Sequence, residues 1–90
     1  MGKPWTPAEI RRYESARHAV NTRMRATPRS RRITLADVVD ALRGAGYARS
    51  ERYVRAVLGG EKRSRPALRE ISAAVRACRT RREAGLPEWL

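Results

Sequence analysis

The sequence has few of the residues on which most catalytic and metal sites depend. It contains one cysteine, Cys78, and one histidine, His18. A lone cysteine cannot form a disulfide within the chain, which is typical of an intracellular protein. A single histidine cannot build a His-based zinc site or a catalytic dyad. Cys78 lies on an apolar helical seam and is read as a core residue. We therefore expect no enzyme activity, no metal, no cofactor and no small-molecule substrate.

Long apolar stretches and large aromatic side chains are also scarce. No run of about 18 apolar residues exists, so we expect no membrane span, and the N-terminus lacks the apolar segment of a secretory signal. Phenylalanine is absent, and the apolar residues are mostly Ala, Val, Leu and Ile, which favours small interlocking helices. A chain of 90 residues has room for one core. We predict a single all-α domain over residues 1–90, located in the cytoplasm.

Acidic residues are few compared with basic ones. The chain has 9 Asp and Glu against 21 Lys and Arg, which gives a formal net charge of +12. Such a surface concentrates polyanions and releases their counterions on contact, so nucleic acid is the expected partner. An anionic membrane surface competes with it. A helix lying on a membrane, however, needs large apolar residues opposite its arginines, and this chain has mostly Ala and Val there.

Residues 34–60 carry the pattern around which the rest of the chain is organised. Thr34 is an expected N-cap, and Asp37 stands at the position that completes a capping box. Gly44 and Gly46 are expected to end this helix, because glycine readily takes the left-handed conformation of a C-terminal cap. Apolar residues recur with the spacing of a helix that buries one face: Leu35, Val38, Val39 and Leu42.

A second short helix is predicted directly after the glycine-bearing turn. Ser50 is a good N-cap, and Glu51 suits the positive end of the helix dipole. Arg52 and Arg55 point outward, and Gly60 follows the helix. Its inner stripe is Val54, Val57 and Leu58. Two short helices joined in this way, the second presenting arginines, are typical of a helix-turn-helix that fills a major groove. The alternative is a helical hairpin with a solvated basic face.

The N-terminal helix is predicted over residues 7–26, with Thr6 and Glu9 forming a capping box around Pro7. Its inward residues are expected to be Ile10, Tyr13, Ala16, Val20 and Met24. A basic linker, residues 27–33, follows because Pro28 disfavours helix at the preceding residue. Its arginines lie either along phosphates or in a minor groove, as basic arms do, or in solvent.

The closing helix is predicted over residues 64–84, with Ser64 as its cap and Pro66 in its first turn. Its apolar seam is Leu68, Ile71, Val75 and Cys78. The tail, residues 85–90, contains Leu86, Trp89 and Leu90. These side chains are expected to be buried, either against the N-terminal helix or against a partner subunit.

From residue 34 to about residue 75 the sequence resembles the helix-turn-helix of the lambda-repressor and Cro (XRE-like) family, of the phage or actinobacterial type. The turn before Tyr53 is longer than in most members. The resemblance is carried by Ser50-x-x-Tyr53-Val54-x-x-Val57-Leu58-x-Gly60 and then Pro66-x-Leu68-x-x-Ile71-x-x-x-Val75. It implies a small bundle of four to five helices and a transcriptional regulator, a repressor, that binds double-stranded DNA sequence-specifically. It also leaves open whether the chain binds as a homodimer on paired half-sites or as a monomer.

The resemblance places the helix of residues 50–58 in the major groove. Guanidinium groups pair with guanine edges, so Arg52 and Arg55 are the first candidates for base contacts. The full base-contacting set is Arg49, Glu51, Arg52 and Arg55. Phosphate contacts are assigned to Arg29, Arg31, Arg32, Thr34, Ser50, Tyr53, Lys62, Arg63 and Arg65.

Two other functions fit the same composition. Residues 17–32 are rich in arginine, and such segments order on RNA hairpins. Alternatively, the helical bundle docks on an acidic host protein such as a polymerase, and its DNA binding is incidental.

Overall fold

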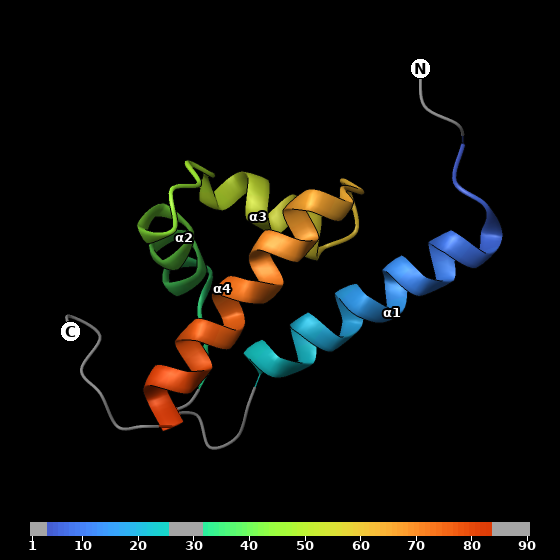
Figure 1. Cartoon of the computed structure of the whole chain (residues 1–90). Coiled ribbons are helices and arrows are strands. Elements are labelled where there is room, and N and C mark those ends of the chain that lie inside the picture. The colour runs from blue at the N-terminus through green and yellow to red at the C-terminus, as the bar shows by residue number, and fades with distance from the viewer. Residues whose placement is uncertain (1–3, 26–31, 84–90) are drawn as a thin grey trace.

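The computed structural model describes residues 4–25 and 32–83. These residues form helices and connecting turns (Figure 1). The helices are α1 (Pro7–Met24), α2 (Leu35–Gly44), α3 (Glu51–Leu58) and α4 (Arg65–Glu83). The predicted all-α class is confirmed, and α1 ends slightly earlier than predicted, at Met24. The predictions for Arg29, Arg31 and the tail of residues 85–90 fall outside the described residues.

Two helices begin with the capping boxes that the sequence predicts. At α1 the Glu9 amide donates to Thr6 Oγ1 at 3.2 Å, and the Thr6 amide donates to Glu9 Oε1 at 3.1 Å. At α2 the Asp37 amide donates to Thr34 Oγ1 at 3.2 Å, and the Thr34 amide donates to Asp37 Oδ2 at 2.8 Å. Each box satisfies amides that the first helical turn leaves without a partner.

The end of α2 is a Schellman motif built on Gly46. Gly46 has φ +93°, a left-handed conformation that costs residues with a Cβ atom. Its amide donates to the Arg43 carbonyl at 3.0 Å, and the Tyr47 amide donates to the Leu42 carbonyl at 2.8 Å. These are the two bonds that define the motif. Gly44 is instead the last residue of the helix itself.

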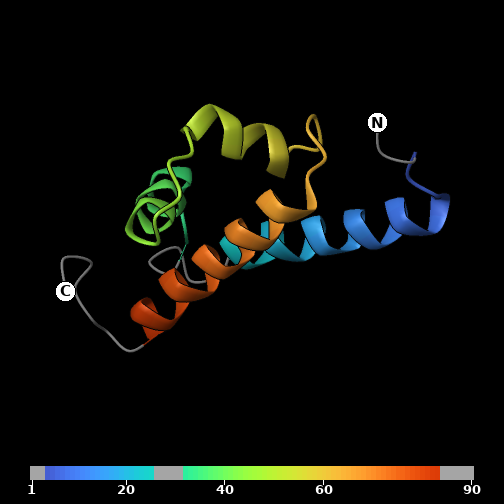
Figure 2. The same ribbon diagram turned by 45° about the horizontal axis from the view of Figure 1, so that its top comes forward.

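The core lies where α4 meets the other helices, each of which it contacts (Figure 1). Figure 2 shows α3 lying across one side of α4, with α1 running alongside α4. Burying an aliphatic side chain contributes roughly 1.5–3 kcal/mol, and α2, α3 and α4 each bury two almost completely. These are Val38, Leu42, Val54, Val57, Ile71 and Val75. No helix in the described part of the chain is long and apolar enough to cross a membrane.

The buried face of α1 differs from the prediction at one residue. Tyr13, Val20 and Met24 are buried as expected, but Ala16 is exposed, so the prediction that it faces inward is wrong. Ala16 lines an open groove between α1 and α4. Two half-buried polar residues, Arg17 and Asn21, instead contact the end of α3.

Candidate nucleic-acid interface

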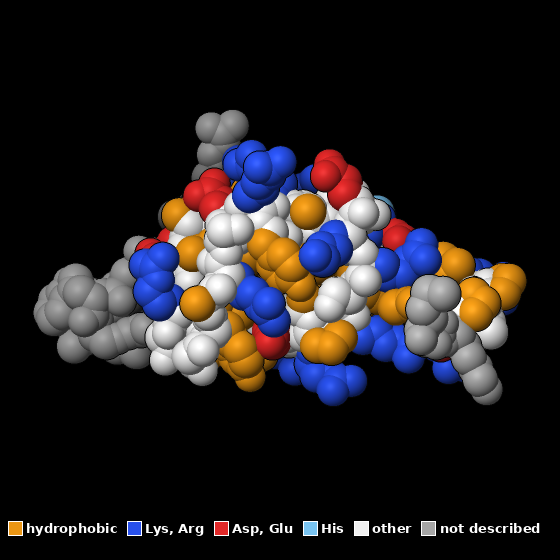
Figure 3. Space-filling model, turned by 90° about the horizontal axis from the view of Figure 1, so that it is seen from above, with side chains coloured by type: hydrophobic (Ala, Val, Ile, Leu, Met, Phe, Trp, Pro, Cys, Tyr) orange, Lys and Arg blue, Asp and Glu red, His pale blue; other side chains and the backbone are white. Residues whose placement is uncertain are grey.

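The face of α3 that points away from the core is open. Val54, Val57 and Leu58 are buried, whereas Glu51, Arg52 and Arg55 are exposed, as the pattern predicts. The helix is held at its start by Ser50, whose Oγ accepts from the Tyr53 amide at 3.1 Å. Figure 3 shows the side of the molecule on which α3 lies, with Lys and Arg side chains distributed between acidic and apolar ones. The helix therefore presents a short charged ridge to solvent.

The three predicted base-contacting arginines are not equally available. Arg52 is exposed, and no described residue forms an ion pair with it. Arg55 Nη2 lies 3.2 Å from Glu51 Oε1, and both side chains are more than half exposed. Exposed pairs of this kind contribute little and exchange easily. Arg49 is different, because its Nη2 lies 3.1 Å from Glu70 Oε2 and the Glu70 side chain is only 15% exposed.

Tyr53 stands between two cations next to the start of α3. The guanidinium carbon of Arg49 and the ammonium nitrogen of Lys62 each lie 4.9 Å from the centre of its ring. A cation over an aromatic ring is stabilised by roughly 0.5–1 kcal/mol at an exposed site. The ring therefore favours the observed positions of both cations, and Arg49 is held in addition by Glu70.

Trp5 makes the same kind of contact with two arginines at the end of the α3–α4 loop and the start of α4. Arg63 and Arg65 lie over its ring, with guanidinium carbons 5.3 and 4.5 Å from the centre. Trp5 itself packs edge-on against Tyr13, with ring centroids 5.2 Å apart. Arg65 also forms an ion pair with Glu9. We call the combined set the cation–aromatic strip: Trp5, Arg49, Tyr53, Lys62, Arg63 and Arg65.

Two acidic residues lie next to this strip, Glu70 beside Arg49 and Glu9 beside Arg65. The pKa of the Glu9 carboxyl is lowered, first by the hydrogen bond from the Thr6 amide and then by the hydrogen bond from Arg65. Both contacts favour the charged form of the carboxylate. Glu9 therefore neutralises part of the Arg65 charge, as Glu70 does for Arg49, while Lys62 and Arg63 lie over the rings.

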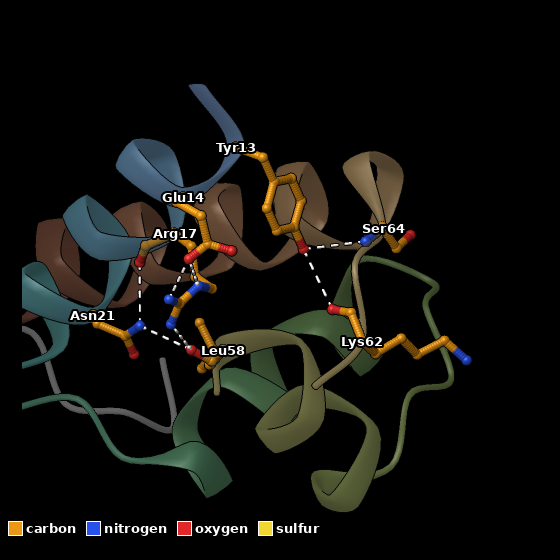
Figure 4. A network of polar contacts seen from close by, with 7 residues as sticks. All are labelled: Tyr13, Glu14, Arg17, Asn21, Leu58, Lys62 and Ser64. Carbon is orange, nitrogen blue, oxygen red and sulfur yellow. Dashed lines mark hydrogen bonds and ion pairs between the residues drawn. The ribbon is translucent and has the colours of Figure 1, made fainter. Parts of the chain in front are cut away.

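The loop that carries Lys62 and Arg63 is tied to α1 by a buried tyrosine (Figure 4). The Tyr13 hydroxyl accepts from the Ser64 amide at 3.1 Å and donates to the Lys62 carbonyl at 3.4 Å. Tyr13 is 5% exposed. Tyr13 of α1 thus holds the loop before α4, which carries Lys62 and Arg63 of the strip.

The end of α3 is held by two further α1 side chains, and this contact has no counterpart in the sequence-based predictions. The Leu58 carbonyl accepts from Arg17 Nη1 at 2.9 Å and from Asn21 Nδ2 at 3.0 Å (Figure 4). A cationic donor suits the negative end of a helix. Glu14 binds the other side of the same guanidinium, with Oε2 2.9 Å from Arg17 Nε. We call Arg17, Asn21 and Leu58 the α1–α3 clamp.

Of the remaining predicted phosphate contacts, Ser50 caps the start of α3, and Arg32 and Thr34 lie near the start of α2. Arg32 is exposed and lines a shallow pocket of about 260 Å³ with Arg25 and Met24 of α1. The Thr34 hydroxyl is used in the helix cap. Arg25, which the sequence reasoning did not single out, also lines a groove of about 390 Å³ together with Arg55. A second group of basic side chains therefore extends from the outer face of α3 toward the end of α1.

No family model matches this chain, and comparisons with curated proteins and with solved structures found no match. The likeness to the lambda-repressor and Cro family thus stays a resemblance. The function has to be argued from the site.

The arrangement is suited to binding a polyanion, with the outer face of α3 as the part of the protein that projects toward it. The outer face of α3 projects three charged side chains, and fixed cations lie beside it on the loop before α4. None of these groups forms a constellation of catalytic type in the described part of the chain.

Proposed function

We propose that the protein binds double-stranded DNA sequence-specifically and regulates transcription as a repressor, with α3 in the major groove. The observation that carries this proposal is the position of the exposed ridge of α3 next to the cation–aromatic strip. The major groove is about 12 Å wide and admits an α-helix. The eight-residue helix α3 is roughly 12 Å long, so it can follow only a short segment of that groove.

Within this proposal Arg52 is the principal base reader. It is exposed, and its guanidinium is free to pair with guanine O6 and N7. Arg55 reads a second base after exchanging its weak pair with Glu51, which is then able to accept from cytosine N4. Arg49 is held by Glu70 and Tyr53. We therefore move Arg49 from the base-reading set to the phosphate-contacting set.

The strip supplies the contacts that carry affinity and register. Phosphate contacts position a protein on the duplex, and base contacts give it specificity. Lys62, Arg63 and Arg65 lie on or beside the loop before α4, and each contacts the ring of Tyr53 or Trp5. If about five phosphates are neutralised, affinity should fall several-hundred-fold between roughly 50 and 200 mM salt.

The test is selection of bound sequences from a random duplex library at two salt concentrations. It is followed by comparison of Arg52→Ala with Arg43→Ala. Arg43 is an exposed arginine of α2 whose contact with Asp40 is long, at 3.9 Å, so its loss removes the same charge away from the ridge. Arg52→Ala should cost roughly 1–3 kcal/mol on the selected site and little on random DNA. Arg43→Ala should weaken binding to the selected site and to random DNA by much less than this.

The same experiment decides between the open alternatives. Selected sites with two-fold symmetry and half-sites about 34 Å apart indicate a homodimer, and asymmetric sites indicate a monomer. Equal weakening of all sequences by Arg52→Ala would refute the base-reading role. A nearly flat salt response, or tighter binding to a structured RNA competitor, would refute the proposal as a whole.

A further inference from the structure

A second surface of the molecule, formed by α1 and α4, shares Arg65 with the cation–aromatic strip and otherwise lies outside the proposed DNA site. A groove of about 800 Å³ runs between these helices, and its lining comes from α1 and α4 rather than α2 or α3. None of the lining residues belongs to α3, whose outer face carries the DNA-facing ridge. A ligand there would leave α3 free.

The lining has a regular chemical pattern. On α1 the groove residues Arg12, Ala16, Ala19 and Arg23 follow the spacing i, i+4, i+7, i+11, which is one face of a helix. On α4 the residues Arg65, Arg69, Ser72 and Arg76 repeat that spacing, with Ala73 beside them. Alanines and Ser72 thus line the groove together with Tyr13, Val20 and Leu68, and arginines flank these residues along about 16 Å.

The exposure of the alanines shows that no element among residues 4–25 and 32–83 covers this face. Ala16, Ala19 and Ala73 are all exposed. Small residues let a second backbone approach closely, and a groove between two helices accepts the apolar face of a third. The five arginines of the lining are opposed by one acidic residue, Glu9, which is already paired with Arg65.

We propose that this groove binds an acidic amphipathic helix of a partner protein. Its alanine and leucine face would pack on the small residues of the groove, and its carboxylates would meet the flanking arginines. A second copy of this chain fits poorly, because it brings further arginines into a site that already holds five. Nucleic acid would pair with the arginines but fits less well, because it would leave the exposed alanines of the groove without an apolar partner. The proposal does not rest on DNA binding.

The test uses a fluorescently labelled, synthetic helical peptide of roughly 14 residues, with Leu and Ala on one face and Glu on the flanks. Fluorescence anisotropy with the full chain at about 150 mM salt is compared with a scrambled peptide of the same composition. We expect the patterned peptide to bind at least about tenfold more tightly, because only it presents a continuous apolar face.

Two matched pairs of variants locate the binding. Ala73→Gln fills the groove without changing charge, and Ala77→Gln places the same side chain on an exposed position of α4 outside the lining. The first should weaken peptide binding about tenfold or more, since close packing does not absorb a larger side chain, and the second should not. Arg69→Glu should likewise weaken it, whereas Arg11→Glu on the outer face of α1 should have a smaller effect.

Several outcomes would overturn the proposal. Equal binding of both peptides would show non-specific attraction, and an unaffected Ala73→Gln variant would show binding elsewhere. Peptide binding that appears only after deletion of residues 85–90 would make the tail the occupant. If the chain forms a dimer that the groove variants dissociate, the occupant is a second copy of the chain. If an oligonucleotide rather than the peptide binds in a way that depends on the groove residues, the occupant is nucleic acid. Duplex DNA binding, measured on the same variants, reports separately on the proposed function.

Discussion

The α1–α3 clamp predicts a specific form of non-additivity in stability. The Leu58 carbonyl has two donors, Arg17 and Asn21, and it has two lone pairs to receive them. Removing either donor leaves the carbonyl satisfied by the other. Removing both leaves a carbonyl at the end of α3 without a side-chain partner, and such a group costs more than the loss of one ordinary hydrogen bond.

The perturbations are Arg17→Met and Asn21→Leu, which keep most of each side chain in place and limit the entry of water. Loss of a charged hydrogen bond costs roughly 1.5–3 kcal/mol, and loss of a neutral one about 1 kcal/mol. We expect about 1.5 kcal/mol for Arg17→Met and about 1 kcal/mol for Asn21→Leu. The double variant should lose about 1 kcal/mol more than their sum, because an unsatisfied carbonyl costs a further 1–3 kcal/mol.

Urea unfolding of the four proteins measures this coupling. The control is Glu14→Gln, which removes only the ion pair between Glu14 and Arg17. It should lower the free energy of unfolding by at most about 1 kcal/mol, because the Glu14 side chain is 37% exposed. For a domain of this size each kcal/mol lowers the melting temperature by roughly 4–8 °C. Strict additivity, or a double variant no less stable than Arg17→Met alone, would refute the shared-acceptor reasoning.

Three further experiments, with four variants, test the fold around the site. Gly46→Ala should destabilise by roughly 1–2 kcal/mol because of its φ of +93°, whereas Gly44→Ala, in open space inside α2, should stabilise by roughly 0.5–1 kcal/mol; equal effects in urea unfolding would contradict the left-handed cap. Glu9→Gln should remove a pH-dependent part of stability. Because the folded pKa of Glu9 is lowered, its contribution is complete above the ordinary value of 4.5 and is lost as the pH falls below it. Unfolding at about pH 7 and about pH 3 should therefore show a larger deficit for the variant at the higher pH. Leu42→Ala should cost roughly 2–5 kcal/mol, since this side chain is 1% exposed, and a cost below about 1 kcal/mol would contradict its place in the core.

Local features of the fold could be predicted from the sequence because they depend on neighbouring residues. The boxes at Thr6 and Thr34 were predictable, since a cap and its third successor always meet at the start of a helix. The buried stripe Val54–Val57–Leu58 and the outward position of Arg52 follow from helical periodicity alone. The sequence therefore determined the helices, their starts and the outer face of α3.

Contacts between distant segments required the tertiary structure. Arg17 looks in the sequence like any other arginine of α1, because its partner is a backbone carbonyl of α3, and backbone carbonyls carry no sequence signal. Likewise, the sequence gives no sign that folding brings Glu70 of α4 against Arg49. The exposure of Ala16 in the groove between α1 and α4 also depends on how the helices pack. Apolar spacing within one helix reports which residues avoid water, and only the packed chain decides which arginines are held by the protein and which are left for a partner.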